Sequence, residues 1–140
     1  MPEQSPGLMF QPDSDSRPYW EGLKQGELRI QRCNACSRAV FYPRAICPHC
    51  FSDQLSWIVA TGKGIIYSYT VAHQAFGPFA EKTPFVVAIV ELEEGARMMT
   101  HIIDSPRERI AIGKAVQVTF ESAFESGGDN LTLPYFRLVE

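Results

Sequence analysis

The sequence lacks long hydrophobic runs, an excess of basic residues and more than a few cysteines. No apolar stretch approaches the ~20 residues that a membrane-spanning helix requires. Residues 1–11 have neither a basic start nor a sustained apolar run, so we expect no secretory signal and a cytoplasmic location. The formal net charge is -3. That value argues against a protein whose affinity depends on neutralising nucleic-acid phosphates.

A catalytic constellation is also missing. The turn at residues 61–64 (TGKG) does not complete the phosphate-loop pattern G-x4-G-K-[ST]. His73 and His101 are isolated near the ends of predicted strands, and nothing in the spacing forces His101 into an acid/base pair with Glu91 or Asp104. We therefore predict no catalytic residues. If the chain takes part in a reaction, a partner supplies the chemistry.

Four cysteines are present, and their spacing is informative. Cys33, Cys36, Cys47 and Cys50 form two C-x2-C pairs separated by ten residues. Two such pairs in turn-forming stretches are typical of two knuckles that bind one tetrahedral Zn²⁺. Two disulfides are disfavoured without an export signal. A redox C-x-x-C is disfavoured because there are two matched pairs and neither opens a helix after a strand. All four thiolates would then be zinc ligands, leaving none as a nucleophile.

A short helix is predicted ahead of the cysteines. Residues 1–15 are rich in Pro, Ser and Gln and predict a flexible arm. The helix spans residues 16–26, with Pro18 in its first turn and Gly26 as its stop. Tyr19 and Trp20 belong to its apolar stripe. They either pack on the chain's own zinc module or anchor a partner subunit, and the sequence leaves both readings open.

The rest of the chain predicts a mainly β protein. Residues 27–54 predict a zinc ribbon of two short hairpins held by one metal ion, in which His49 is a surface residue. Residues 55–140 predict an OB-fold domain, entered through a linking strand at 55–60 and a tight turn at 61–64. Five strands followed by polar turns fit a Greek-key barrel better than a sandwich, which needs about seven strands. The predicted strands are 65–72, 85–92, 97–103, 115–121 and 133–139, with a polar loop at 126–130.

Charge divides the chain into two unlike parts. Residues 17–63 carry seven basic and three acidic residues, a net charge of +4. Residues 64–140 carry six basic and ten acidic residues, a net charge of -4. Single-stranded nucleic-acid binding by an OB fold needs a positive groove with exposed aromatics, and the acidic barrel disfavours that alternative.

Several motifs occur in order along nearly the whole chain beyond about residue 16. They are residues 20–23 (WEGL), 26–28 (GEL), 31–36 (QRCNAC), 42–50 (YPRAICPHC), 62–64 (GKG), 67–70 (YSYT), 90–95 (VELEEG), 112–116 (IGKAV) and 133–136 (LPYF). Together they resemble one family, the thiolase-associated zinc-ribbon/OB-fold proteins. The resemblance implies a helical N-terminus, a rubredoxin-like zinc ribbon and a C-terminal five-stranded OB fold.

The resemblance implies an accessory, non-catalytic subunit of an acyl-CoA-processing complex. Such proteins are thought to assist assembly with a larger thiolase-like subunit and to help bind the CoA thioester. An accessory subunit of an enoyl-CoA hydratase-type enzyme is an alternative. Thiolase-type enzymes are dimers in general, so symmetry would place two copies of this chain.

The chemistry of CoA then selects candidate contacts. Basic side chains suit its phosphates, and apolar side chains suit the acyl or pantetheine path. The candidates are Arg32, Arg38, Arg44 and Lys63 for the phosphates, and Phe76 and Phe79 for the path.

Overall fold

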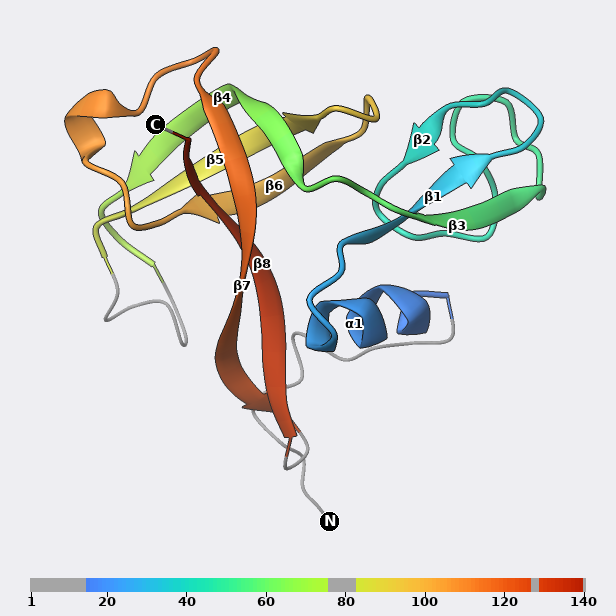
Figure 1. Cartoon of the computed structure of the whole chain (residues 1–140), viewed down its shortest axis with the longest axis horizontal. Helices are drawn as coiled ribbons and strands as arrows, with labels where there is room; N and C mark the ends of the chain where they lie inside the picture. Colours follow the sequence, from blue (N-terminus) through green and yellow to red (C-terminus); the bar gives the residue numbers. More distant parts are fainter. Residues whose placement is uncertain (1–14, 76–82, 127–128, 140) are drawn as a thin grey trace.

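A helix, a small sheet and a closed barrel make up the described chain, in which the computed structural model covers residues 15–75, 83–126 and 129–139 (Figure 1). The predicted fold class, mainly β with one short N-terminal helix, is confirmed. No described helix is long and apolar enough to cross a membrane. The elements are α1 (Arg17–Lys24), β1 (Arg29–Cys33), β2 (Ala39–Val40), β3 (Leu55–Val59), β4 (Lys63–Ala72), β5 (Phe85–Leu92), β6 (Arg97–Ile102), η3 (Arg107–Arg109), β7 (Ala115–Ser126) and β8 (Asp129–Leu138).

Helix α1 ends where the sequence predicts. Gly26 adopts a positive φ of 79°, which glycine accepts without steric cost. The Gly26 amide then donates to the Leu23 carbonyl (3.1 Å) and the Glu27 amide donates to the Gly22 carbonyl (2.8 Å). This pair of bonds is a Schellman cap. It turns the chain so that the buried Leu23 faces the core and Arg29 can start β1.

The ribbon is a three-stranded sheet in the order β2-β1-β3. Strand β3 pairs with β1 from Arg29↔Val59 to Cys33↔Leu55, so it joins the ribbon as a third strand beside the predicted hairpins. The two faces of this sheet have different neighbours. Val40 and Cys33 are buried on the cysteine side, whereas Ile30 and Ala39 are part of the main hydrophobic core.

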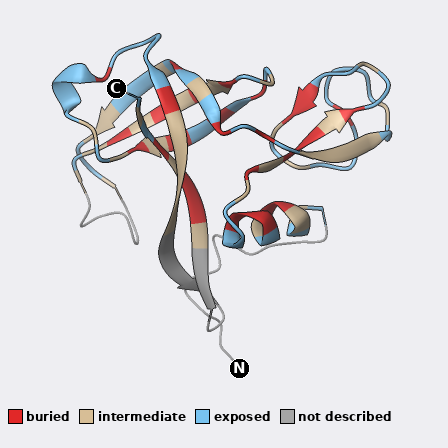
Figure 2. Ribbon diagram, in the orientation of Figure 1, coloured by how far each residue is buried: buried red, intermediate tan, exposed pale blue. Residues whose placement is uncertain are grey.

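The barrel closes in the order β4-β5-β6-β8-β7, with β4 pairing back to β7. Strand β5 has the predicted bounds, and every second residue from Val86 to Leu92 is buried inside the barrel (Figure 2). Strands β7 and β8 are longer than predicted. They form a hairpin that pairs as far as Ser126↔Asp129, in place of the polar loop expected at 126–130. In Figure 1 this hairpin extends below the barrel, and α1 lies beside β8.

The link between ribbon and barrel is fastened to the β5–β6 hairpin. The Thr61 amide donates to a carboxylate oxygen of Glu94 (3.0 Å), and the Thr61 hydroxyl donates to Glu93 (3.0 Å). The Glu93 amide donates to the Lys63 carbonyl (3.0 Å). Gly62 sits at φ 81°, and an added Cβ would lie 2.4 Å from a Val118 methyl. The linker therefore has little freedom to bend.

Candidate functional site

The four cysteines come together at the end of the ribbon. Their sulfurs all lie within 4.8 Å of one another. The Cys33–Cys50 and Cys36–Cys47 sulfurs are 3.5 and 3.8 Å apart, too far for a disulfide, whose bond is about 2.05 Å long. A tetrahedral Zn²⁺ with Zn–S bonds of about 2.3 Å has sulfurs about 3.8 Å apart. The cluster is consistent with a structural Zn²⁺.

Each C-x2-C pair is shaped as a knuckle. The Cys36 amide lies 3.5 Å from the Cys33 sulfur, and the His49 amide lies 3.3 Å from the Cys47 sulfur. The residue after each pair, Ser37 or Phe51, has a positive φ. Its amide donates to the carbonyl of the first cysteine of the pair, at 2.8 and 2.9 Å. The amide of Cys36, together with that of Ala35 and the neighbouring thiols, lowers the pKa of the Cys33 thiol to about 6, whereas the bond to Cys33 and burial raise the pKa of Cys50.

A buried glutamine holds the second knuckle against β1. Gln31 is 5% exposed. Its amide nitrogen donates to the Arg44 carbonyl, and its amide oxygen accepts from the Arg44 amide, both at 2.9 Å. These two side-chain bonds tie the segment at Arg44, which has no strand of its own, to β1. This role of Gln31 could not be predicted from the sequence, because a lone Gln in a strand gives no signal of its partner.

The predicted CoA contacts occupy different surfaces. Arg38 and Arg44 are exposed on the ribbon. Nη1 of Arg38 lies 3.3 Å from Nδ1 of His49, and Nε of Arg44 donates to the Tyr42 carbonyl. Arg32 is half-buried in β1, and its Nε has no hydrogen-bond partner among the described residues. Lys63 lines a separate hollow on the barrel. Phe76 and Phe79 lie outside the described residues.

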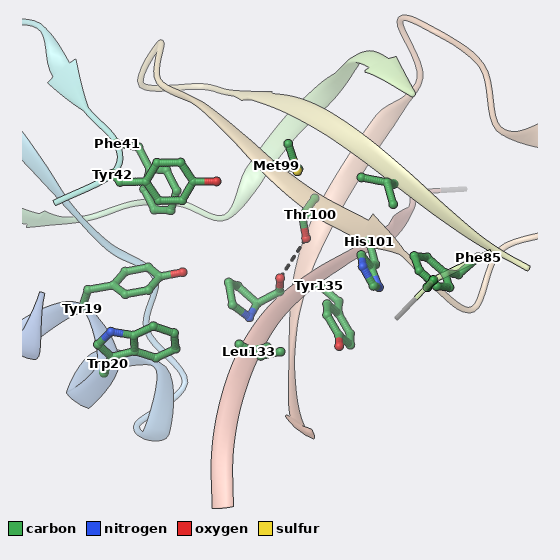
Figure 3. A pocket seen from close by; sticks show the side chains of 13 residues that line it. Tyr19, Trp20, Phe41, Tyr42, Phe85, Met99, Thr100, His101, Leu133 and Tyr135 are labelled. Atoms are coloured by element: carbon green, nitrogen blue, oxygen red, sulfur yellow. Dashed lines mark hydrogen bonds between the residues drawn. The ribbon is translucent and has the colours of Figure 1, made fainter. Parts of the chain in front are cut away.

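A second feature, which we call the aromatic groove, runs between the helix, the ribbon and the barrel (Figure 3). Its volume is about 590 Å³. As far as the described residues define it, none of its lining side chains is Asp, Glu, Lys or Arg. It is lined by Tyr19, Trp20, Phe41, Tyr42, Ala75, Phe85, Val87, Met99, Thr100, His101, Leu133, Pro134 and Tyr135.

Two groups of rings form opposite walls of this groove. On one wall Tyr19 packs edge-on against Trp20 and Phe41, with ring centroids 5.0 and 5.5 Å apart. On the other, His101 stacks between Phe85 and Tyr135, at 4.6 and 5.2 Å. Tyr19 is therefore buried within the chain, while Trp20 is partly buried and faces the groove.

The phenols of Tyr19 and Tyr135 stay uncharged at neutral pH. Burial raises the pKa of Tyr19, and the nearby Tyr42 adds to the rise. Burial also raises the pKa of Tyr135, with a smaller effect from Glu121. Tyr42 and Met99 are 52% and 59% exposed, although both are large and apolar. The groove therefore offers rings and a thioether to whatever fills it.

Comparison with known proteins places both halves of the chain in one family. Residues 20–56 match the model "ChsH2, rubredoxin-like zinc ribbon domain", and residues 57–121 match "ChsH2, C-terminal OB-fold domain". A "DUF35 domain-containing scaffold protein" of Methanocaldococcus jannaschii is 38% identical over 114 residues, which are 80% of this chain and 81% of the relative.

Two further relatives are parts of enzymes. A "Probable enoyl-CoA hydratase alpha subunit" of Thermomonospora curvata is 41% identical over 123 residues, which are 88% of this chain but 37% of that protein's length. A chain from the solved structure "Ltp2-ChsH2(DUF35) aldolase" superimposes with a TM-score of 0.76 at 39% identity, covering 91% of this chain and 96% of the other.

Proposed function

The chain belongs to the ChsH2/DUF35 family of zinc-ribbon and OB-fold proteins, and on this premise we propose that it is a scaffold subunit of an acyl-CoA-processing complex. Its partner is a thiolase-like aldolase subunit, which carries out the catalysis. The observation that supports this most directly is the likeness to the DUF35 chain of a solved aldolase complex, over nearly the full length of both chains.

The chemistry of the described site fits a scaffold rather than an enzyme. Four thiolates complete the coordination of a tetrahedral Zn²⁺, so no position is left for a substrate or an activated water. The metal would shape the ribbon and fix its strands. The second knuckle lies beside the β5–β6 hairpin of the barrel, because Pro48 and His49 line a common hollow with Gly95 and Arg97.

Binding of acyl-CoA is the finer part of the proposal. The exposed guanidinium groups of Arg38 and Arg44 would contact the CoA phosphates together with the partner, and Arg32 and Lys63 remain candidates. The net charge of +4 over residues 17–63 supports this. Replacing Arg38 and Arg44 together by Gln should weaken CoA binding by the assembled complex in calorimetry. Unchanged affinity would remove these two residues from the CoA site.

The proposed function is tested by isolation from the native host. A tagged copy of the chain should co-purify with a thiolase-like subunit, identified by mass spectrometry, in equal numbers of the two chains. The complex should cleave or condense an acyl-CoA, and the purified chain alone should not. Elution of the chain without any such subunit, in the presence and absence of acyl-CoA, would contradict the proposal.

A hydratase-associated role is the second candidate. It is favoured by the 41% identity to a hydratase alpha subunit, of whose length this chain covers 37%. In that case the co-purified partner would hydrate an enoyl-CoA, and a loss of absorbance by the conjugated thioester would report the reaction. If the complex instead cleaves a carbon–carbon bond of the acyl-CoA, the partner is an aldolase and the hydratase-associated role is wrong.

A further inference from the structure

The barrel is closed by one weak seam, between β6 and β8. These two strands are bridged at a single position, the parallel pair Ile102↔Phe136. The Ile103 amide donates to the Phe136 carbonyl (2.8 Å) next to it, and the Thr100 hydroxyl donates to the Pro134 carbonyl (2.8 Å). Over the rest of β6, the described residues provide no ladder toward β8.

Pro134 explains why the seam opens. In the β7–β8 hairpin, the Val139 amide donates to the Ala115 carbonyl. Every second residue of β8 counted from Val139 therefore directs its backbone N–H and C=O toward β7, and the residues between them direct theirs toward β6. Phe136 and Pro134 thus present their backbones toward β6. Proline has no N–H to donate, so the ladder cannot continue past it. The two strands separate there, and the aromatic groove begins (Figure 3).

The same alternation shows which backbone groups of β6 point away from β5. The Leu92 amide donates to the Ala96 carbonyl, which makes Met98 and Thr100 the residues that bond to β5. The N–H and C=O of Met99 therefore point to the opposite edge, into the seam. Met98 and Thr100 are buried inside the barrel, and the Met99 side chain faces outward. No described strand pairs with Met99 on the seam side.

We propose that this edge receives an extended, uncharged segment of the catalytic partner subunit, which adds a strand to β6 and places its apolar side chains in the aromatic groove. The inference rests on the proposed function. An unpaired strand edge bonds an extended chain through its backbone, and adjacent pockets select alternate side chains. The groove supplies such pockets from rings on both walls.

The charge of the lining residues indicates which kind of ligand fits the aromatic groove. Charged residues make up 21% of the chain, yet none of the described lining residues is Asp, Glu, Lys or Arg. A CoA phosphate or a nucleic acid would meet no Lys or Arg among the described lining residues. An apolar segment would instead match the groove, because the cores of protein interfaces are depleted in charge and enriched in aromatic residues and Met. Tyr42 and Met99 would be its exposed contacts.

The test uses the wild-type chain with the subunit that co-purifies with it. Hydrogen exchange by mass spectrometry should show slower exchange of residues 97–103 in the complex than in the free chain. Met99→Pro removes the seam-side donor without touching a bond to β5, and it should weaken binding about tenfold or more. Met99→Leu keeps the donor and the apolar side chain, and it should bind within about twofold of wild type.

A second pair of variants tests the groove itself. Tyr42→Ala removes an exposed ring from the wall and should weaken binding about tenfold. Tyr67→Ala removes a ring of similar exposure, 46% against 52%, that does not line the groove, and should have little effect. Circular dichroism and zinc content identify any variant that fails to fold, and the exchange experiment on the wild-type chain needs no variant.

Each outcome has a distinct meaning. If no subunit co-purifies with the wild-type chain, the proposed function fails and this inference fails with it. If wild type binds but residues 97–103 are not protected, or Met99→Pro and Tyr42→Ala bind as well as wild type, the inference alone is overturned. A dimer of the free chain that Met99→Pro abolishes would assign the edge to a second copy and also overturn it.

Discussion

Removal of zinc is expected to unfold the two knuckles and leave the barrel folded. The change is Cys47→Ser, or treatment of the wild-type chain with a strong chelator. Cys47 is fully buried and contributes one of the four sulfurs. His49→Ala is the matched control, because His49 is exposed in the same knuckle and its side chain is not a ligand in the four-cysteine cluster.

The magnitude follows from how little else stabilises this region. On the cysteine side of the ribbon, Val40 is the one buried side chain in the cluster besides cysteines, among the described residues. Its burial contributes about 1.5–3 kcal/mol. A structural Zn²⁺ contributes about 10–16 kcal/mol and is the largest single term on the favourable side.

The opposite face of the ribbon should behave differently. Ile30 and Ala39 belong to the main core with Leu23 of α1 and with the barrel, and none of these contacts involves the metal. Hydrogen exchange after chelation should therefore rise in 34–54 and stay low in β5 and β6. Full exchange of the barrel on the same time scale would refute this separation. Unchanged exchange in 34–54 after verified zinc loss would refute the dominance of the metal.

Three further predictions concern stability and use denaturant unfolding. Gln31→Ala should lower the free energy of unfolding by about 1–3 kcal/mol, because it removes two hydrogen bonds to the Arg44 backbone. Gly62→Ala should lower the free energy of unfolding by about 2–5 kcal/mol, because Gly62 has a positive φ and an added Cβ would clash with Val118. Gly26→Ala is the control: Gly26 has a similar φ but open space around it, and the loss should be about 1–2 kcal/mol. Burial raises the pKa of Tyr19, so the stability that its neutral phenol contributes is complete below about pH 10 and is lost as the pH rises toward the raised value. Tyr19→Phe should abolish that part of the alkaline loss, measured between pH 8 and 11; an identical pH profile would contradict it.

Much of the fold could be predicted because its signals are local. The helix stop at Gly26, the strand at 85–92 and the turn at Gly95 depend on residues close in the sequence. The pairing of β3 with β1 could not be predicted in this way. It joins Leu55 to Cys33 across the whole zinc loop, and no pattern within either strand specifies that register.

The candidate site, too, could be predicted only in part from the sequence. The cysteine cluster was predictable, since metal ligation imposes spacing on the sequence itself. The aromatic groove was not, because its rings come from α1, the ribbon, β5, β6 and β8, and each ring alone fits an ordinary core position. The even choice left open for Tyr19 and Trp20 has a mixed answer: Tyr19 packs within the chain, and Trp20 faces the groove. One signal was available in Pro134, a proline inside a predicted strand.

The bonds from Thr61 to Glu93 and Glu94 have a mechanical consequence. They tie the ribbon to the hairpin whose second strand is β6. The ribbon and this hairpin should therefore move together as one rigid unit. A force applied to the ribbon would be carried to β6 without bending at the linker, so the strand edge at Met99 would keep its position relative to the ribbon.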